Sequence, residues 1–196
     1  MLAGSVIASG FSRRFGRDKL TNTFLGRPLI SWAVDAVSQL SYKSVVLKAS
    51  DVKRVYVPST YDVLVNTRAS EGLSAGIKLA ASWTPRSAEG LVIVLGDMPF
   101  TKPVVQKIVK VFYEERCEAV SAGLGGVPST PAVFSRTVLH KLMMLEGDVG
   151  AKHILKQVRA KVLDVDERLL TDVDTEENLV KAEAVFKDLS SFKNLD

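Results

Sequence analysis

Cysteine and histidine are nearly absent from the sequence. Cys117 is the only cysteine, so the chain can form no intrachain disulfide bond and lacks the cysteine spacing of a zinc finger. The two histidines, His140 and His153, fall in helical patterns, where a surface or partly buried side chain is a more common role than catalysis. This usage is compatible with a reducing compartment and favours a cytoplasmic location.

The sequence also lacks long apolar runs and a strong excess of one charge. No stretch is long and apolar enough to span a bilayer. The basic residues near the N-terminus follow the apolar run instead of preceding it, unlike those of a signal peptide. The 26 basic and 22 acidic residues give a net charge of +4. A membrane or nucleic-acid partner is therefore not expected, whereas a basic mouth for an anionic small molecule explains the charge.

The remaining composition is that of an ordinary globular protein. Hydrophobic residues make up 46% of the 196 positions and charged residues 24%, which is enough to bury a sizeable core. No internal repeat or linker divides the chain. The sequence therefore predicts a single domain over residues 1–196.

Short apolar runs alternate with segments of helical periodicity along most of the chain. The runs predict strands over residues 6–8, 44–47, 62–65, 91–95, 119–122 and 161–165. The periodic segments predict helices over residues 28–40, 72–83, 103–116, 138–145, 151–158 and 176–189, the last capped by Thr175. The segment 123–131, rich in glycine and proline, predicts a loop. Such alternation implies an α/β fold with a mainly parallel, twisted sheet wrapped by helices.

The loop after the first predicted strand is basic and contains two glycines. It runs from Gly10 to Lys19 and holds three arginines against the single acid Asp18. Its glycines allow the backbone to approach a ligand, and exposed N–H groups with guanidinium forks suit phosphate oxygens. It is not a Walker P-loop, because five residues separate Gly10 from Gly16 and no Lys-Ser/Thr pair follows. A basic surface turn after a buried strand is the alternative interpretation.

Acidic residues stand at two places where a ligand could bind. One place is just after the apolar run 91–95, and the other is at the start of the last predicted helix. Asp97 stands just beyond the run, where it could serve a ligand or only cap the turn at Met98-Pro99. The acidic segment 172–177 suits a helix N-terminus, where carboxylates are favourable on dipole grounds. Because ligands of parallel sheets bind at the carboxyl ends of strands, the basic loop and Asp97 are expected to open on one face.

Several stretches together resemble the signatures of the MobA-like nucleotidyltransferases. Gly10-x-Ser12-x-Arg14-Phe15-Gly16-x-x-Lys19 resembles the N-terminal signature, with phenylalanine in place of the usual methionine, and Gly96-Asp97-Met98-Pro99 resembles the second. Residues 172–177 (DVDTEE) resemble D-x-D-T-P-E-D, with Glu176 in place of proline. Residues 71–76 (EGLSAG) resemble the start of the family's third helix, and residues 146–152 (EGDVGAK) resemble the G-D-x-G-A-R of the MocA-like cytidylyltransferase branch. The segment 126–131 departs from the family, because it lacks the expected G-H-P.

The resemblance implies a three-layer α/β/α fold of the nucleotide-diphospho-sugar transferase, Rossmann-like type. It also implies transfer of a nucleotidyl group from an NTP to a phosphate of molybdopterin, with release of pyrophosphate. Arg14 and Lys19 would then hold the triphosphate as catalytic residues, and Asp97 and Asp174 would bind Mg²⁺, with Mn²⁺ as the alternative. The implied nucleotide-binding residues are Ile7, Ala8, Ser9, Gly10, Ser12, Asn66 and Ser74.

Ser9 bears on the identity of the base. At residues 7–10 the guanylyltransferase branch usually has L-A-G-G and the cytidylyltransferase branch L-A-A-G; serine is nearer alanine in size and favours CTP. A guanylyltransferase acting on molybdopterin or on another phosphorylated small molecule is the alternative. A non-catalytic, nucleotide-binding partner in molybdoenzyme maturation is an alternative of another class. A molybdoenzyme or its chaperone is the protein partner that the resemblance suggests.

Overall fold

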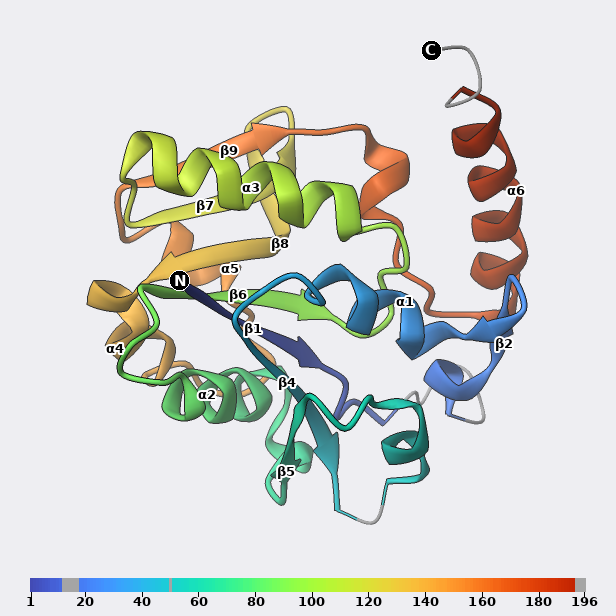
Figure 1. The fold of residues 1–196 in the computed structure, drawn as a ribbon, viewed down its shortest axis with the longest axis horizontal. Coiled ribbons are helices and arrows are strands. Elements are labelled where there is room, and N and C mark those ends of the chain that lie inside the picture. The colour runs from blue at the N-terminus through green and yellow to red at the C-terminus, as the bar shows by residue number, and fades with distance from the viewer. Residues whose placement is uncertain (12–17, 50, 193–196) are drawn as a thin grey trace.

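A seven-stranded sheet forms the centre of the molecule (Figure 1). This computed structural model describes residues 1–11, 18–49 and 51–192. The strand order is β5-β4-β1-β6-β8-β7-β9, and within this sheet β8 alone runs antiparallel to its neighbours. The strands are β1 (Leu2–Ile7), β4 (Tyr42–Lys48), β5 (Asp62–Asn66), β6 (Gly90–Leu95), β7 (Ala119–Leu124), β8 (Val127–Ser135) and β9 (Ala160–Asp164). The predicted α/β fold with a mainly parallel sheet is confirmed.

Helices cover both faces of the sheet and complete three layers (Figure 1). Helices α1, α3 and α6 contribute side chains to one buried cluster, and α2, α4 and α5 contribute to a second cluster on the other face. The helices are α1 (Leu29–Ala36), α2 (Leu73–Trp83), α3 (Lys102–Glu115), α4 (Leu139–Leu142), α5 (Lys152–Leu155) and α6 (Glu176–Phe192). Among the described residues, no helix is long and apolar enough to cross a membrane.

Short elements make up several of the connections. A small antiparallel hairpin lies between β1 and α1, and 3₁₀ turns join several of the larger elements. The hairpin strands are β2 (Thr23–Phe24) and β3 (Arg27–Pro28), and the turns are η1 (Lys19–Thr21), η2 (Val52–Tyr56), η3 (Ala69–Glu71), η4 (Arg136–Val138) and η5 (Glu167–Leu170). The turn η1 follows the basic loop predicted to bind phosphate.

Strand β1 shows why the central strands read as continuous apolar runs. All six of its residues are buried. Leu2 and Val6 belong to the cluster that includes α1 and α3, whereas Ala3 and Ile7 belong to the cluster that includes α2. Successive side chains of a strand point to opposite faces, so a strand covered on both sides is mostly apolar. The buried hydroxyl of Ser5 is accommodated because it accepts a hydrogen bond from Ser44 Oγ at 2.9 Å.

The segment 123–131 is not a loop, and the prediction for it is wrong. Strands β7 and β8 form an antiparallel hairpin whose turn contains Gly125 and Gly126, with φ values of +55° and +77°. Such left-handed backbone favours glycine. The register shifts between Ser121 and Ala122, which leaves Pro131 outside the paired positions of the hairpin. The missing N–H of this proline therefore removes no bond from the ladder.

The helices that follow β8 are shorter than predicted. The segment predicted as a helix over 138–145 contains only the single turn of α4, preceded by η4, and the segment 151–158 contains only α5. The predicted cap of the last helix is confirmed, because the Asn178 N–H donates to Thr175 Oγ1 at 3.1 Å. A side-chain oxygen at this place satisfies one of the N–H groups that a helix start leaves unpaired.

Candidate active site

The carboxyl ends of β1 and β6 lie side by side and present their loops at one edge of the sheet. The strands pair in parallel up to their last residues, and the Gly96 N–H donates to the Ile7 carbonyl oxygen at 3.0 Å. A Cβ added at Gly96 would lie 3.1 Å from the Ala8 Cβ, so this close approach favours glycine. Asp97 therefore follows a tightly packed turn, at the edge where the loop from Gly10 begins.

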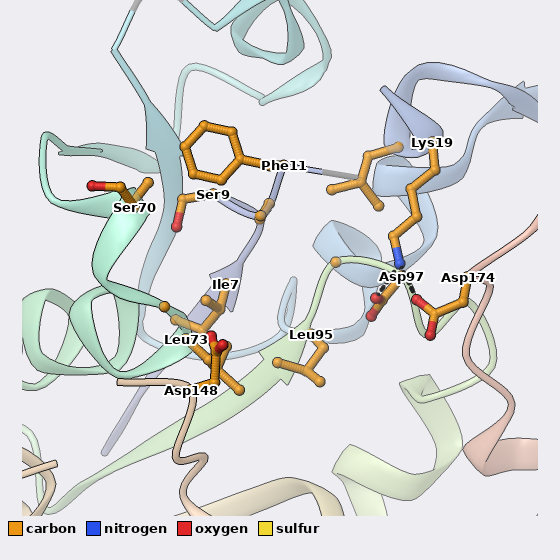
Figure 2. A pocket seen from close by; sticks show the side chains of 16 residues that line it. Ile7, Ser9, Phe11, Lys19, Ser70, Leu73, Leu95, Asp97, Asp148 and Asp174 are labelled. Carbon is orange, nitrogen blue, oxygen red and sulfur yellow. Dashed lines mark hydrogen bonds and ion pairs between the residues drawn. The ribbon is translucent and has the colours of Figure 1, made fainter. Parts of the chain in front are cut away.

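A cavity of about 450 Å³ opens at this edge (Figure 2). Figure 2 shows Phe11, Ser9 and Ser70 at one end of it, and Lys19 with Asp97 at the other. The lining residues that the sequence predicted as site residues are Ile7, Ala8, Ser9, Gly10, Lys19, Asp97 and Asp174. Lining residues to which the sequence assigned no role include Phe11, Ser70, Leu73 and Asp148. Leu73 and Asp148 could have been predicted as lining residues, because they lie in the stretches 71–76 and 146–152 that resemble the family.

Lys19 joins the two carboxylates that the sequence predicted as metal ligands. Its Nζ donates to Asp97 Oδ2 and to Asp174 Oδ1, each at 2.7 Å (Figure 2). The side chains of Lys19 and Asp97 are 11% and 21% exposed, whereas that of Asp174 is 40% exposed. Side chains 78 and 155 positions from Lys19 in the sequence thus meet at its ammonium group.

The backbone also brings these segments together. Lys19 begins η1, Asp97 follows β6, and Asp174 lies just before α6. The Val173 N–H donates to the Asp97 carbonyl oxygen at 3.0 Å, and the Val173 side chain is fully buried. The two acidic segments are therefore fixed to each other by packing and by a main-chain hydrogen bond, independently of the lysine.

The carboxylates keep Lys19 charged. Burial disfavours the ammonium form, but the attraction of Asp97 and hydrogen bonds to both carboxylates outweigh it, so the pKa of Lys19 is raised. The pKa of Asp172 is raised too, first by partial desolvation and then by the charges of Asp174 and Asp97. The site thus combines the charged ammonium group of Lys19 with the negative charges of several carboxylates.

The two carboxylates fit a divalent cation. Asp97 Oδ1 is buried and has no hydrogen-bond partner among the residues that the structure describes, while its other oxygen faces Lys19. Carboxylate oxygens suit Mg²⁺, which commonly takes one or two carboxylates together with substrate phosphates and water. Within the described part of the chain, no group of three or more histidine, cysteine or acidic side chains could hold a metal. Substrate phosphates and water commonly supply the other ligands of such a cation.

The other predicted nucleotide-binding residues are placed in different ways. Ser9 lines the cavity, and its Oγ accepts a hydrogen bond from Asn66 Nδ2 at 3.0 Å. Asn66 and Ser74 are buried, the latter in α2. Neither of them is among the described residues that line the cavity. Ser12 and Arg14 lie outside the described residues.

A second cavity of about 350 Å³ adjoins the first. Both are lined by Leu73, Leu95 and Asp148. The hydroxyl-bearing Ser129 and Thr130 of β8 line the second cavity, and its further charged residues are Lys152 and Asp172. This cavity could hardly be predicted from the sequence, because serine, threonine and proline between two glycines and an apolar run are typical of a loop.

Asp148 is held between the two cavities by packing against the start of α2. The Ser74 N–H donates to the Gly147 carbonyl oxygen at 3.1 Å. Gly72 has a φ of +99°, and a Cβ there would overlap Asp148 Oδ1 and lie 2.6 Å from the Gly147 carbonyl. Glycine is therefore required at position 72 on two grounds, backbone conformation and close approach.

Ligands of open α/β sheets bind at the carboxyl ends of the strands, and Lys19, Asp97 and Asp174 meet at that edge of this sheet. The chain belongs to the family of the MobA-like NTP transferase domain, whose sequence profile matches residues 4–162. The predicted family is thereby confirmed, and with it a nucleotidyltransferase family that includes molybdenum cofactor guanylyltransferases.

Curated relatives are moderately similar. Proteins named "Probable molybdenum cofactor guanylyltransferase" from Pyrococcus furiosus and Pyrococcus horikoshii are each 31% identical to this chain. The alignment covers 70% of this chain and 70% of the first protein, and 59% of this chain and 58% of the second. The purine catabolism protein PucB of Bacillus subtilis is 29% identical over 90% of this chain and 93% of its own length.

Solved structures establish the fold. Rv0371c from Mycobacterium tuberculosis H37Rv has a TM-score of 0.82 at 24% identity, covering 94% of this chain and 98% of that one. A complex of Rv0371C with manganese has a TM-score of 0.76 at 22% identity, covering 93% and 98%. The three-layer, Rossmann-like architecture of the nucleotidyltransferases is therefore the architecture of this chain.

Proposed function

We propose that this chain transfers a nucleotidyl group from an NTP to a phosphate of a small-molecule acceptor and releases pyrophosphate. The observation that carries the proposal is the contact of Lys19 Nζ with Asp97 and Asp174, each at 2.7 Å, inside the cavity of about 450 Å³. With its ammonium group turned to a triphosphate, Lys19 would bind the phosphates and leave oxygens of the two carboxylates for a counter-cation. Family membership supports the same reaction.

The reaction needs no protein nucleophile. An oxygen of the acceptor phosphate forms a bond to the α-phosphorus, and the bond from that phosphorus to the bridging oxygen breaks, so pyrophosphate leaves with the electron pair. Catalysis then consists mainly of positioning and of balancing negative charge. Lys19, together with Arg14, would hold the triphosphate and balance the charge that develops on the leaving pyrophosphate.

Asp97 and Asp174 would hold a divalent cation, Mg²⁺ or Mn²⁺. When bound, the cation neutralises charge on the phosphate oxygens and so favours attack at the α-phosphorus. The buried, unpartnered Oδ1 of Asp97 supports this assignment. The manganese complex of a protein with the same fold supports it as well.

The nucleotide would lie with its phosphates toward Lys19 and its base toward Ser9 and Phe11, at the two ends of the cavity seen in Figure 2. The backbone from Ile7 to Gly10 would border the base. Ser12 and Ser74 are retained as candidate contacts, whereas Asn66 would act on the base indirectly, because its amide group holds the Ser9 hydroxyl. We infer that CTP is favoured over GTP, since the Ser9 side chain reduces the space for a purine.

The acceptor would occupy the second cavity, which adjoins the first along Asp148 and Leu73. Lys152 offers a cation for a phosphate, and Ser129 and Thr130 offer hydroxyl groups in place of the G-H-P segment of the family. We propose molybdopterin as the acceptor. The product would then serve a molybdoenzyme or its chaperone, in the cytoplasm.

A guanylyltransferase acting on molybdopterin or on another phosphorylated small molecule is the second candidate. It is favoured by the names of the two Pyrococcus relatives. The remaining candidate, a non-catalytic nucleotide-binding partner in molybdoenzyme maturation, would have no need for Lys19 and both carboxylates together.

One experiment separates these functions. The protein is incubated with each of the four NTPs, with Mg²⁺ or Mn²⁺ and with molybdopterin, and pyrophosphate release is followed. We expect release that depends on both the acceptor and the cation and that is fastest with CTP. Faster release with GTP would identify the second candidate. Nucleotide binding without any release would identify the non-catalytic one.

A further inference from the structure

Lys53 is a fully buried lysine that lies outside both cavities. Its side chain is 0% exposed, and its Nζ contacts Asp18 Oδ2 at 2.5 Å and Asp51 Oδ2 at 2.8 Å. The side chain of Asp51 is 2% exposed and that of Asp18 is 22% exposed. A buried ammonium group is costly unless carboxylates compensate it, and a buried carboxylate is costly without a cation. The three side chains therefore hold one another in place.

Asp18 and Asp51 have the same local role in two different turns. Asp18 Oδ1 accepts a hydrogen bond from the Leu20 N–H at 3.2 Å and caps η1, while Asp51 Oδ1 accepts from the Lys53 N–H at 3.0 Å and caps η2. The second oxygen of each carboxylate contacts Lys53 Nζ. Lys53 thus ties η2, in the connection between β4 and β5, to η1, whose first residue is Lys19.

We propose that Lys53 is a positioning residue for Lys19 and that it acts through Asp18. Lys19 follows Asp18 directly, and the Asp18 carbonyl oxygen accepts from the Thr21 N–H at 3.3 Å and from Thr21 Oγ1 at 2.9 Å. Both polar groups of Asp18 therefore shape the turn that directs Lys19 Nζ to the two carboxylates of the site. The proposal rests on the proposed function, because Lys19 matters there as a ligand of the triphosphate.

Asp51 supplies a matched control for this role. It contacts the same ammonium group as Asp18 and caps a turn of the same kind, but it lies in the connection between β4 and β5. Its replacement should lower the melting temperature, because a buried carboxylate that accepts two backbone N–H groups, from Lys48 and Lys53, is lost. It leaves the link between Lys53 and Asp18 in place and should not alter the direction of Lys19.

The test compares Lys53→Met, Asp18→Asn and Asp51→Asn by calorimetric titration with CTP and with GTP in Mg²⁺. Asn at position 18 keeps the shape and the capping ability of the side chain, so this variant serves if Lys53→Met does not fold. We expect Lys53→Met and Asp18→Asn to weaken nucleotide binding about tenfold, the lower end of the effects of groups that orient a ligand. Asp51→Asn should leave the affinity within about twofold of the wild type.

Repeating the substitutions in Lys19→Ala protein tests whether Lys53 and Asp18 act through Lys19. In Lys19→Ala protein, Lys53→Met and Asp18→Asn should weaken binding no further, because substitutions that act through one group are not additive. A purely structural role for Lys53 would instead add its loss to that of Lys19. Additive losses would overturn the proposal. Unchanged affinity of Lys53→Met and Asp18→Asn in the protein that keeps Lys19, or an equal loss of affinity in Asp51→Asn, would overturn it as well.

Hydrogen exchange keeps this inference separate from the proposed function. If the wild-type protein binds none of the nucleotides, the proposed function fails. Hydrogen exchange of the amides of residues 20–22 then tests the link from Lys53 to η1 by itself. Faster exchange there in Lys53→Met and Asp18→Asn, but not in Asp51→Asn, would support the link from Lys53 to η1. Exchange equal to that of the wild type in Asp18→Asn would overturn it.

Discussion

The parallel half of the sheet, β5-β4-β1-β6, and the mixed half, β8-β7-β9, differ in the sequences that form their strands. The residues of β6 are buried almost throughout and form an unbroken apolar run from Leu91 to Leu95. Strand β8 pairs with β6 only over residues 132–135, and its outer part, Val127 to Thr130, is only partly buried or exposed. An apolar run therefore marks strands with neighbours and helices on both sides, and it does not mark the ribbon that extends beyond the sheet.

The candidate site draws on both halves. Lys19 and Asp97 come from connections of the parallel half, whereas Asp174 comes from the segment after β9. Asp148, between the two cavities, belongs to the segment between α4 and α5. Substitutions in each half can therefore separate what each contributes.

The largest effect should follow from Asp97→Asn, in the parallel half. The substitution keeps the shape but removes a largely buried negative charge that would hold the cation. Because that cation would balance the charge of the transition state, turnover should fall about 100-fold or more. Asp174→Asn, in the mixed half, should cost less, because that side chain is 40% exposed. Pyrophosphate release measures both, with circular dichroism as the control for folding. Equal losses at the two positions would remove the distinction between the halves.

Lys19→Ala should weaken NTP binding about 10- to 100-fold, because a hydrogen bond to a charged group contributes roughly 1.5–3 kcal/mol. Calorimetric titration with CTP measures the change. Lys110→Ala is the matched control, since Lys110 is exposed on α3 and pairs only with a neighbouring acid of the same helix among the described residues. Unchanged affinity and turnover in Lys19→Ala would remove Lys19 from the site.

Because the pKa of Lys19 is raised, the difference in free energy of unfolding between the wild type and Lys19→Ala should depend on pH in a defined way. A folded pKa above the unfolded value of about 10.4 means that the stabilisation by Lys19 is complete below that pH and is lost as pH rises through the folded pKa. The difference in free energy of unfolding between wild type and Lys19→Ala should therefore stay constant from about pH 7 to 9. Urea denaturation across this range measures it, and a steady decline would contradict the sign of the shift.

Gly72→Ala tests the junction between the halves, where the start of α2 meets the segment of Asp148. The left-handed φ and the overlap with Gly147 and Asp148 should lower the free energy of unfolding by about 1–3 kcal/mol. Gly150→Ala is the control, because its Cβ would meet only the flexible end of Leu73, at 3.3 Å. Similar losses in both variants would mean that the junction has no special constraint.

The smallest effect is expected at Ser9, in the parallel half. If its side chain reduces the space for a purine, Ser9→Gly should raise the ratio of kcat/KM for GTP to that for CTP by up to about tenfold, the scale of one small group in a pocket. Asn66→Ala, which frees the Ser9 hydroxyl without removing it, should change the ratio less. An unaltered ratio in Ser9→Gly would mean that base selection lies elsewhere.

The sequence predicts the strands of the parallel half together with β7 and β9, and it predicts several residues that line the candidate site, because these depend on local signals. Among the strands of the main sheet, only β8 falls mostly within a segment predicted as a loop. The run before Asp97 defines a buried strand, and the aspartate follows where such a strand ends. The contacts of Lys19 with two acids could not be predicted, because a lysine after a basic loop indicates a phosphate ligand and the acids lie far away in sequence. The burial of Lys53 could not be predicted, since a lysine in the stretch 51–54, which holds three charged residues, is typical of a surface and its burial depends on tertiary packing.

The central claim is that one divalent cation links Asp97 of the parallel half with Asp174 of the mixed half beside the nucleotide. A crystal structure of the protein with CTP and Mg²⁺ tests it most directly. We predict the cation at about 2.1 Å from an oxygen of Asp97 and from an oxygen of Asp174, the distance of a direct Mg–O bond, with the Lys19 ammonium group turned from the two carboxylates to the triphosphate. A cation more than about 4 Å from both carboxylates, well beyond that bond length, would contradict the claim.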